Sequence, residues 1–249
     1  MKQKIKTLHI ASFSGNVGDN ANHIGSAFLR EQFMDFEFEI TEREIRGFYW
    51  KDWIFNSKPF VDEANTFDLI IIGGGNYFEL WVEGSKTGTS VDLAVEYLEQ
   101  IKTPVLFYAL GCDIGQGVSE KNALLFNNFL EYVTNRTQFF VCVRNDGSQA
   151  NLRTLFGNRY DEKILVIPDG GFFTKVPDIS NVEIEAEKIN VLINVAGDML
   201  DVRFPVNENS ISYDEFVGKF ASLINDLFNL YKPNLNVIFV PHIFRDYKV

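Results

Sequence analysis

In the stretch Leu69-Ile70-Ile71-Ile72-Gly73-Gly74-Gly75-Asn76, an unbroken apolar run ends in three glycines. Apolar residues at consecutive positions are typical of a strand covered on both faces, as in a parallel sheet flanked by helices. Open α/β sheets bind their ligands at the carboxyl ends of such strands. The stretch therefore predicts a parallel α/β fold with a functional site at that edge of the sheet.

Short apolar strands and amphipathic helices alternate along most of the chain. Strands are predicted at 5–13, 36–40, 68–72, 104–110, 138–143 and 164–167, and helices at 23–34, 91–101, 119–135 and 148–156. This alternation is typical of repeated βαβ units. Residues 1–176 are therefore expected to form an α/β domain with a Rossmann-like parallel sheet and flanking helices.

A second domain is predicted after an acidic, loop-like segment that ends at Lys188. Residues 188–249 contain a strand at 189–195, an amphipathic helix at 213–231 and a strand at 237–240. Two strands and one helix cannot bury a core of their own. We therefore expect this part to be the start of a second Rossmann-like domain, truncated in this chain.

The composition excludes several classes of protein. Among 249 residues, 23 Lys and Arg oppose 34 Asp and Glu, and the net charge of −11 argues against binding nucleic acid or anionic lipid. No uncharged apolar stretch approaches the roughly 18 to 20 residues of a membrane span, and two cysteines are too few for a disulfide framework. A cytoplasmic protein is expected, and its 24 phenylalanines would permit a homo-oligomer.

Two loops after predicted strands are candidate binding sites. The first, at 14–20, contains Asn16, Gly18, Asp19 and Asn20 and precedes a helix, where backbone N–H groups bind anions. The alternative is a tight turn with Asp19 or Asn20 as the helix N-cap. The second loop contains Gly73, Gly74, Gly75 and Asn76, which either approach a ligand closely or form a flexible connector.

Arg144 is predicted at the carboxyl end of a buried strand, where a guanidinium is suited to bind a carboxylate or phosphate. Alternatively it pairs with Asp113 or Asp169, while Asp146 and Gln149 form a capping box on the next helix. Asp169 itself is either a base or a turn aspartate before glycine.

The sequence has three histidines. His9 falls inside a predicted strand and is expected in the core, and His23 opens a helix near the first loop. His242 ends a strand and is the best candidate for a general acid or base. No zinc-ligand spacing or nucleophile elbow occurs, so no metal is implied.

Aromatic residues are candidates for stacking on a sugar, or for packing a lid over the sheet. They are Phe48, Tyr49, Trp50, Trp53, Phe55, Tyr77 and Trp81.

Taken together, these positions resemble the polysaccharide pyruvyltransferase family. The matching segments are 15–20, 72–76, 109–111, 143–148, 169–172 and 240–242. The resemblance implies two Rossmann-like lobes arranged as in GT-B glycosyltransferases. It also implies transfer of pyruvate from phosphoenolpyruvate to a sugar as a ketal, in the cytoplasm, on an exopolysaccharide, capsule or cell-wall precursor.

The resemblance also assigns roles to residues. Arg144 would hold the anionic groups of phosphoenolpyruvate, with Ser148 and the two loops as further binding groups. His242 would act as the acid and base, and Asp19 or Asp169 would orient the acceptor sugar. No cofactor is implied, because phosphoenolpyruvate is the donor substrate.

Two alternatives belong to other functional classes. A GT-B glycosyltransferase that uses a nucleotide-sugar would share the architecture, and so would a non-catalytic Rossmann-like binding module. A nicotinamide dehydrogenase is disfavoured, because the first loop lacks the GxGxxG spacing of a dinucleotide site.

Overall fold

A computed structural model of the chain describes residues 2–14, 16–48, 54–175, 184–196, 200–206 and 210–243. The chain divides into two compact units, residues 1–14 with 18–175 and residues 15–17 with 176–249. Each unit contains a parallel sheet of its own.

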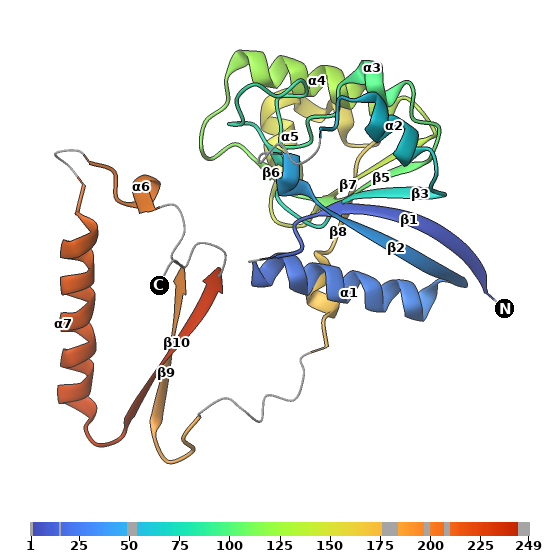
Figure 1. The fold of residues 1–249 in the computed structure, drawn as a ribbon. Coiled ribbons are helices and arrows are strands. Elements are labelled where there is room, and N and C mark those ends of the chain that lie inside the picture. The colour runs from blue at the N-terminus through green and yellow to red at the C-terminus, as the bar shows by residue number, and fades with distance from the viewer. Residues whose placement is uncertain are drawn as a thin grey trace. The chain divides into compact units, whose positions relative to one another are not determined.

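The first unit is built on six parallel strands in the order β2-β1-β3-β5-β7-β8 (Figure 1). The Rossmann-like parallel sheet is therefore confirmed. The chain leaves β1 toward β2 on one side and continues through β3 on the other, so the strand order reverses between β1 and β3. The strands are β1 (Gln3–Ala11), β2 (Phe36–Glu44), β3 (Leu69–Gly73), β5 (Val105–Leu110), β7 (Phe139–Arg144) and β8 (Leu165–Ile167).

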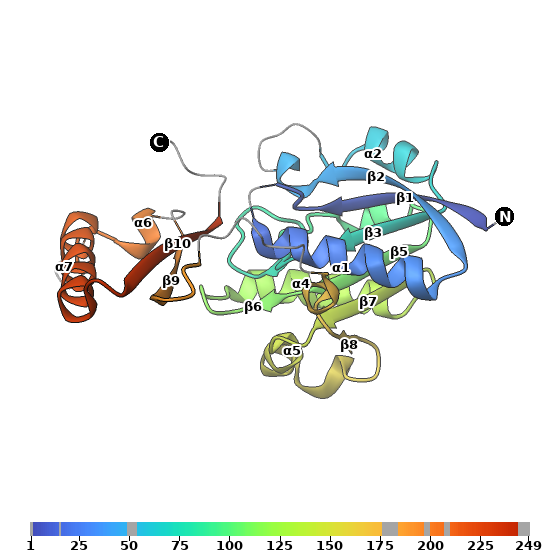
Figure 2. The same ribbon diagram turned by 90° about the horizontal axis from the view of Figure 1, so that it is seen from below.

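Helices cover both faces of this sheet. α1 (Val17–Phe33) lies on one face, and α2 (Lys58–Ala64) and α4 (Glu120–Thr134) lie on the opposite face (Figures 1 and 2). The remaining elements of the unit are β4 (Phe78–Glu79), which pairs with β6 (Cys112–Asp113), α3 (Val95–Leu98), α5 (Ser148–Phe156), and the 3-10 helices η1 (Ile45–Phe48), η2 (Gly157–Tyr160) and η3 (Gly170–Phe173).

The two faces of the sheet are packed differently. The α4 face is an apolar core in which Phe107 of β5 contacts Phe129 of α4 with ring centroids 5.4 Å apart. On the α1 face the buried residues include His9 of β1 and Asn22 and Ser26 of α1. This side of the first unit thus buries polar groups, which need partners of their own.

Several predicted elements differ from the structure. α1 begins at Val17 rather than at residue 23, so Gly18, Asp19 and Asn20 lie in its first turn and neither Asp19 nor Asn20 is its N-cap. The predicted helix at 91–101 is confined to Val95–Leu98. Its start is instead a loop held by side chains, since Asp92 accepts a hydrogen bond from the backbone N–H of Lys86 at 2.5 Å.

The capping box predicted at Asp146 and Gln149 is wrong. The N-cap of α5 is Gly147, whose φ of 99° is in the left-handed region that glycine adopts readily. Asp146 therefore lies outside the helix, where its carboxylate accepts a hydrogen bond from the N–H of Ser148 at 3.1 Å.

The second unit has one parallel βαβ arrangement. β9 (Ile189–Ala196) pairs in parallel with β10 (Leu235–Ile243), and α7 (Tyr213–Tyr231) connects them after the short α6 (Leu200–Arg203). α7 has the predicted bounds, and its N-cap Ser212 accepts a hydrogen bond from the N–H of Glu215. Among the described residues of this unit only Leu235 is buried. None of the helices in the described ranges is long and apolar enough to cross a membrane.

Candidate active site at the carboxyl edge of the sheet

The two predicted loops meet where the strand order reverses. One follows β1 and leads into α1, and the other follows β3, which pairs with β1. A Cβ atom added to Gly74 would lie 2.9 Å from the side chains of Asn22 and His23 of α1. The glycine-rich loop therefore packs directly on the start of α1, at the position where doubly wound sheets bind ligands.

Each of the three glycines is required by a protein neighbour. A Cβ atom at Gly73 would approach the carbonyl oxygen of Tyr108 closer than 3.0 Å, and one at Gly75 would overlap the ring of Tyr77. Gly73 and Gly74 also have φ angles of 145° and 86°, which other residues rarely adopt. Packing alone thus explains the three glycines, and their contact with a ligand stays a prediction.

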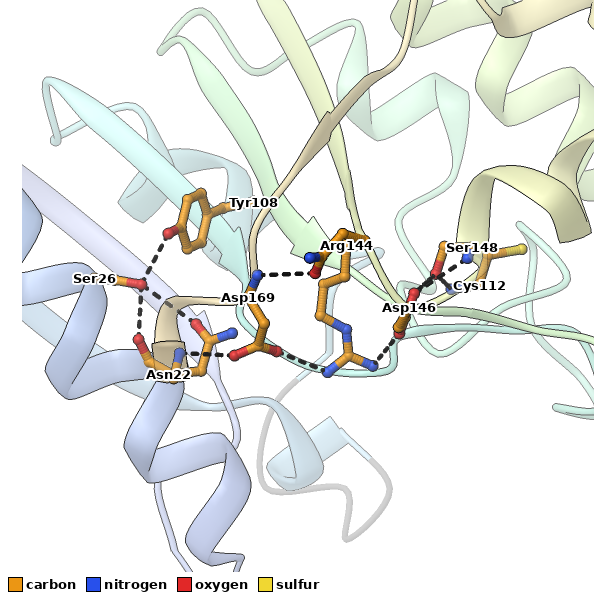
Figure 3. A network of polar contacts seen from close by, with 10 residues as sticks. Asn22, Ser26, Tyr108, Cys112, Arg144, Asp146, Ser148 and Asp169 are labelled. Carbon is orange, nitrogen blue, oxygen red and sulfur yellow. Dashed lines mark hydrogen bonds and ion pairs between the residues drawn. The ribbon is translucent and has the colours of Figure 1, made fainter. Parts of the chain in front are cut away.

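Arg144 lies at the centre of an ionic network at the end of β7 (Figure 3). Its Nη2 atom is 2.9 Å from Asp146 and its Nη1 atom 3.3 Å from Asp169, and its side chain is 19% exposed. The predicted pairing with Asp169 is correct, while Asp146 rather than Asp113 supplies the second carboxylate. The two carboxylates fix the plane of the guanidinium at the sheet edge.

Asn76 and Arg144 come together over Gly111, the residue after β5. A Cβ atom at Gly111 would collide with both Asn76 Oδ1 and Arg144 Nη2. The structure thus brings two predicted binding residues, 68 positions apart in the sequence, to one place, and Gly111 leaves the room for them.

Ser148 is a buried link between Arg144 and the backbone. Its hydroxyl donates to Asp146 and accepts a hydrogen bond of 2.8 Å from the N–H of Cys112 (Figure 3). Partial burial opposes ionisation of Asp146, but the hydrogen bonds from Ser148 and the charge of Arg144 outweigh it and lower its pKa. Ser148 therefore fixes the position of the Asp146 carboxylate, which in turn pairs with Arg144.

Asp169 connects this network to α1. It is the N-cap of η3 and accepts a hydrogen bond of 2.7 Å from the N–H of Gly171. Beside η3, the hydroxyl of Ser26 in α1 donates to Tyr108 of β5 at 3.0 Å (Figure 3). Asp169 is thus a turn residue, as one prediction had it, and its catalytic role stays a prediction.

Asp19 is a mostly buried carboxyl group near both Arg144 and Arg46. Burial raises its pKa, and the charges of His23 and of the two arginines counteract part of this effect. Arg46 is held by Glu44 at 2.7 Å and donates to the carbonyl of Ser14. Sequence analysis missed Arg46, since only the fold brings η1 to the end of β1.

Two neighbouring histidines, His9 and His23, are held neutral by burial. Burial lowers the pKa of His9 to about 3 and lowers that of His23. His9 Nε2 lies 3.1 Å from the carbonyl of Gly73 and His23 Nε2 lies 2.9 Å from that of Ser12, so both Nε2 atoms carry the proton. His9 is in the core as predicted, and His23 reaches the loop after β1.

Three buried side-chain atoms have no hydrogen-bond partner among the described residues: Ser12 Oγ, Asn22 Nδ2 and Arg144 Nε. Ser12 follows β1, Asn22 is in the first turns of α1, and Arg144 ends β7. All three therefore belong to the carboxyl edge of the same sheet. Unpaired buried polar groups are costly, and their clustering makes this edge the candidate binding site of the first unit.

The model of one protein family, polysaccharide pyruvyl transferase, matches residues 16–249. The chain belongs to this family. No curated protein matches the chain. Among solved structures, the crystal structure of a LacI family transcription regulator from Clostridium acetobutylicum is 14% identical over 98% of each chain, with a TM-score of 0.25. That likeness has no bearing on function.

The remaining predicted site residues of this polysaccharide pyruvyl transferase family member lie in the second unit and at the start of α1. His242 is in β10 of the second unit. Asn16 directly precedes α1, and Gly18 and Asn20 lie in its first turn. In the ranges that the structure describes, no group of three or more His, Cys, Asp or Glu side chains is suited to a metal ion.

The predicted aromatic cluster is divided by burial. Phe55 and Tyr77 are 0% and 7% exposed and pack in the core, whereas Trp81 is 39% exposed. Tyr49, Trp50 and Trp53 lie outside the described residues. Within this predicted cluster, Trp81 is thus the one described side chain that is exposed enough to stack on a ligand.

Proposed function

We propose that this polysaccharide pyruvyl transferase family member transfers the pyruvyl group of phosphoenolpyruvate to two hydroxyls of a sugar, forming a ketal on an exopolysaccharide, capsule or cell-wall precursor. The observation that supports this best is the edge at which Arg144 and two further unpaired buried polar groups gather. Phosphoenolpyruvate has a carboxylate and a phosphate that such donors bind. Because it is a cytoplasmic metabolite, the reaction takes place in the cytoplasm.

Arg144 is the proposed anchor for the donor. Its guanidinium has five N–H groups, of which Asp146 and Asp169 occupy one each in the two ion pairs. The N-terminus of α1 and the loop of Gly73 to Asn76 supply further positive potential from backbone N–H groups. In a protein with a net charge of −11, binding of a trianion requires such a local concentration of donors.

The chemistry needs an acid and a base. An acid protonates the methylene carbon, so that C2 becomes electrophilic, and the first sugar hydroxyl adds to C2 while a base takes its proton. The C2–O bond to phosphate then breaks, and the second hydroxyl adds to C2 to close the ketal, while its proton goes to the inorganic phosphate that leaves. His242 is the proposed acid and base, and Asp19 or Asp169 orients the hydroxyls.

The test is calorimetric titration of phosphoenolpyruvate into the wild-type chain, Arg144→Ala and Arg153→Ala. Arg153 is the matched control, because it pairs with Asp161 at 3.0 Å on the exposed side of α5. We expect Arg144→Ala to weaken binding at least about 100-fold, the effect of losing a charge-assisted pair, and Arg153→Ala to bind normally. Equal affinities in all three proteins contradict the proposal.

The same titration separates the alternatives. UDP-glucose, UDP-N-acetylmannosamine and NAD are titrated in parallel. Binding of a UDP-sugar without phosphoenolpyruvate indicates a glycosyltransferase, and binding of none indicates a non-catalytic module. Product formation is followed as phosphate release together with the new methyl signal of the ketal in the NMR spectrum.

A further inference from the structure

A cavity of about 450 Å³ opens beside the carboxyl edge of the first unit. Its walls are the turn after β4 and the turn between β6 and α4. β4 and β6 continue the chain from the ends of β3 and β5, whose following residues Asn76 and Gly111 contact each other. The turns that form the cavity walls are therefore connected in the chain to the strand ends at Asn76 and Gly111, beside which Arg144 lies.

Trp81 forms one wall of this cavity and is held in place from behind. Asn122, buried at the start of α4, donates from Nδ2 to the carbonyl of Leu80 at 2.8 Å and to that of Val82 at 3.0 Å. These carbonyls flank Trp81 on both sides. The backbone that bears the indole is thus fixed before any ligand arrives, which reduces the entropy lost on binding.

The rest of the cavity is polar and balanced in charge. Glu83, Gln116 and Lys121 line it, and all three are exposed. Gly84 and Gly117 form its turns with φ angles of 76° and 100° and with open space around them. One carboxylate and one ammonium favour a neutral ligand with many hydroxyls over an anion, and the indole provides a flat apolar face.

We propose that this cavity binds one pyranose ring of the acceptor saccharide, stacked on Trp81 with its hydroxyls toward Glu83, Gln116 and Lys121. That this saccharide is the acceptor rests on the proposed function. A pyranose fits because it has an apolar face of C–H groups and a rim of neutral hydroxyls. Asn122 is a positioning residue that acts through the Trp81 backbone.

The test measures saccharide binding without the donor. Saturation-transfer difference NMR is recorded with the methyl glycosides of glucose, galactose, mannose and N-acetylmannosamine on wild type, Trp81→Ala and Trp81→Phe. We expect at least one glycoside to bind the wild type, to bind Trp81→Ala at least about fivefold more weakly, and to regain affinity in Trp81→Phe, which keeps an aromatic face. Thermal unfolding and phosphoenolpyruvate titration verify that both variants are folded.

Two results overturn this inference: equal binding by wild type and Trp81→Ala, or no binding of any of the four glycosides. Failure of the proposed function gives a different result, since phosphoenolpyruvate then fails to bind while Trp81-dependent saccharide binding persists. In the working enzyme, Trp81→Ala raises the KM for the acceptor and leaves that for phosphoenolpyruvate unchanged.

Discussion

The two edges of the six-stranded sheet differ in whether their polar groups are hydrogen-bonded. At the amino edge, Asp68 accepts from the N–H of Lys6 at 2.8 Å, and Thr103 donates to the carbonyls of Ala64 and Phe67 at 3.0 and 3.1 Å. At the carboxyl edge, Ser12, Asn22 and Arg144 each bury a polar atom without a partner among the described residues.

This difference indicates that the amino edge of the sheet serves stability and that the carboxyl edge serves function. Paired groups at the amino edge connect the loops that enter the strands, and their loss removes hydrogen bonds of the folded chain. Unpaired groups at the carboxyl edge lower stability, and we propose that a ligand pairs them. Substitutions at the amino edge are therefore expected to change unfolding, and those at the carboxyl edge to change binding and catalysis.

The largest expected effect compares two aspartates, one at each edge. Asp169→Asn keeps the shape of the side chain but removes its charge, and we expect pyruvyl transfer to slow at least about 100-fold, because the sugar hydroxyls lose the carboxylate that orients them. Asp68→Asn retains an oxygen for the N–H of Lys6, and its rate should equal that of wild type. Rates are measured as phosphate release with saturating donor.

If the Asp169→Asn variant is fully active, Asp169 serves only as the N-cap of η3. In that case Asp169 does not orient the sugar hydroxyls, and Asp19 becomes the remaining carboxylate candidate for that role.

The second-largest expected effect is a loss of folding stability in acid, caused by the buried histidine His9. The pKa of His9 is about 3 in the folded chain and 6.5 ordinarily, so between these values the unfolded chain binds a proton that the folded chain does not. Stability therefore falls as the pH drops below about 6.5, by roughly 2 kcal/mol at pH 5. The lowered pKa of His23 acts in the same direction.

Urea unfolding of wild type and His9→Gln at pH 7 and pH 5 measures this effect. The glutamine amide can still donate to the carbonyl of Gly73 but does not titrate, so the variant should lose less stability on acidification. An equal loss in both proteins would show that His9 is not the source of the acid sensitivity.

The smallest effect comes from removing one hydroxyl at each edge. Thr103→Val removes the hydroxyl that donates to the carbonyls of Ala64 and Phe67 and should lower the free energy of unfolding by about 1.5 kcal/mol. Ser12→Ala removes an oxygen that has no hydrogen-bond partner, so its cost should be below about 0.5 kcal/mol. Urea unfolding gives both values.

Phosphoenolpyruvate titration completes this matched pair. Thr103→Val should bind like wild type, and Ser12→Ala should bind a few-fold more weakly because the ligand loses a buried partner. If Thr103→Val is the variant with weaker binding, the assignment of the two edges is reversed.

Much of the fold follows from local sequence pattern. Runs of consecutive apolar residues predicted β3 and β5. The helices α5 and α7 have the predicted bounds because their apolar spacing and first turns are unambiguous. Local pattern failed at residues 17–22 and 91–94. There the chain follows tertiary contacts, such as the hydrogen bond from Lys86 to Asp92, rather than its own periodicity.

The candidate site was foreseen unevenly. Arg144 was identified because a charged residue at the end of a buried strand is unusual. Ser12, Asn22 and Arg46 were missed because a serine, an asparagine and an arginine in ordinary surroundings give no local signal. The glycines of the β3 loop were recognised, but their packing neighbours Tyr108, Asn22 and Tyr77 were not.

The sequence by itself determined the parallel α/β class, the edge of the sheet at which polar residues gather, and the family to which the chain belongs. Those properties depend on patterns within a few residues and on the order of short motifs. Only the tertiary structure decided that Arg144 shares Asp146 and Asp169, that Asn76 meets it over Gly111, and that Trp81 is exposed at a polar cavity. Strand order and register set these contacts, because they bring together residues far apart in the chain.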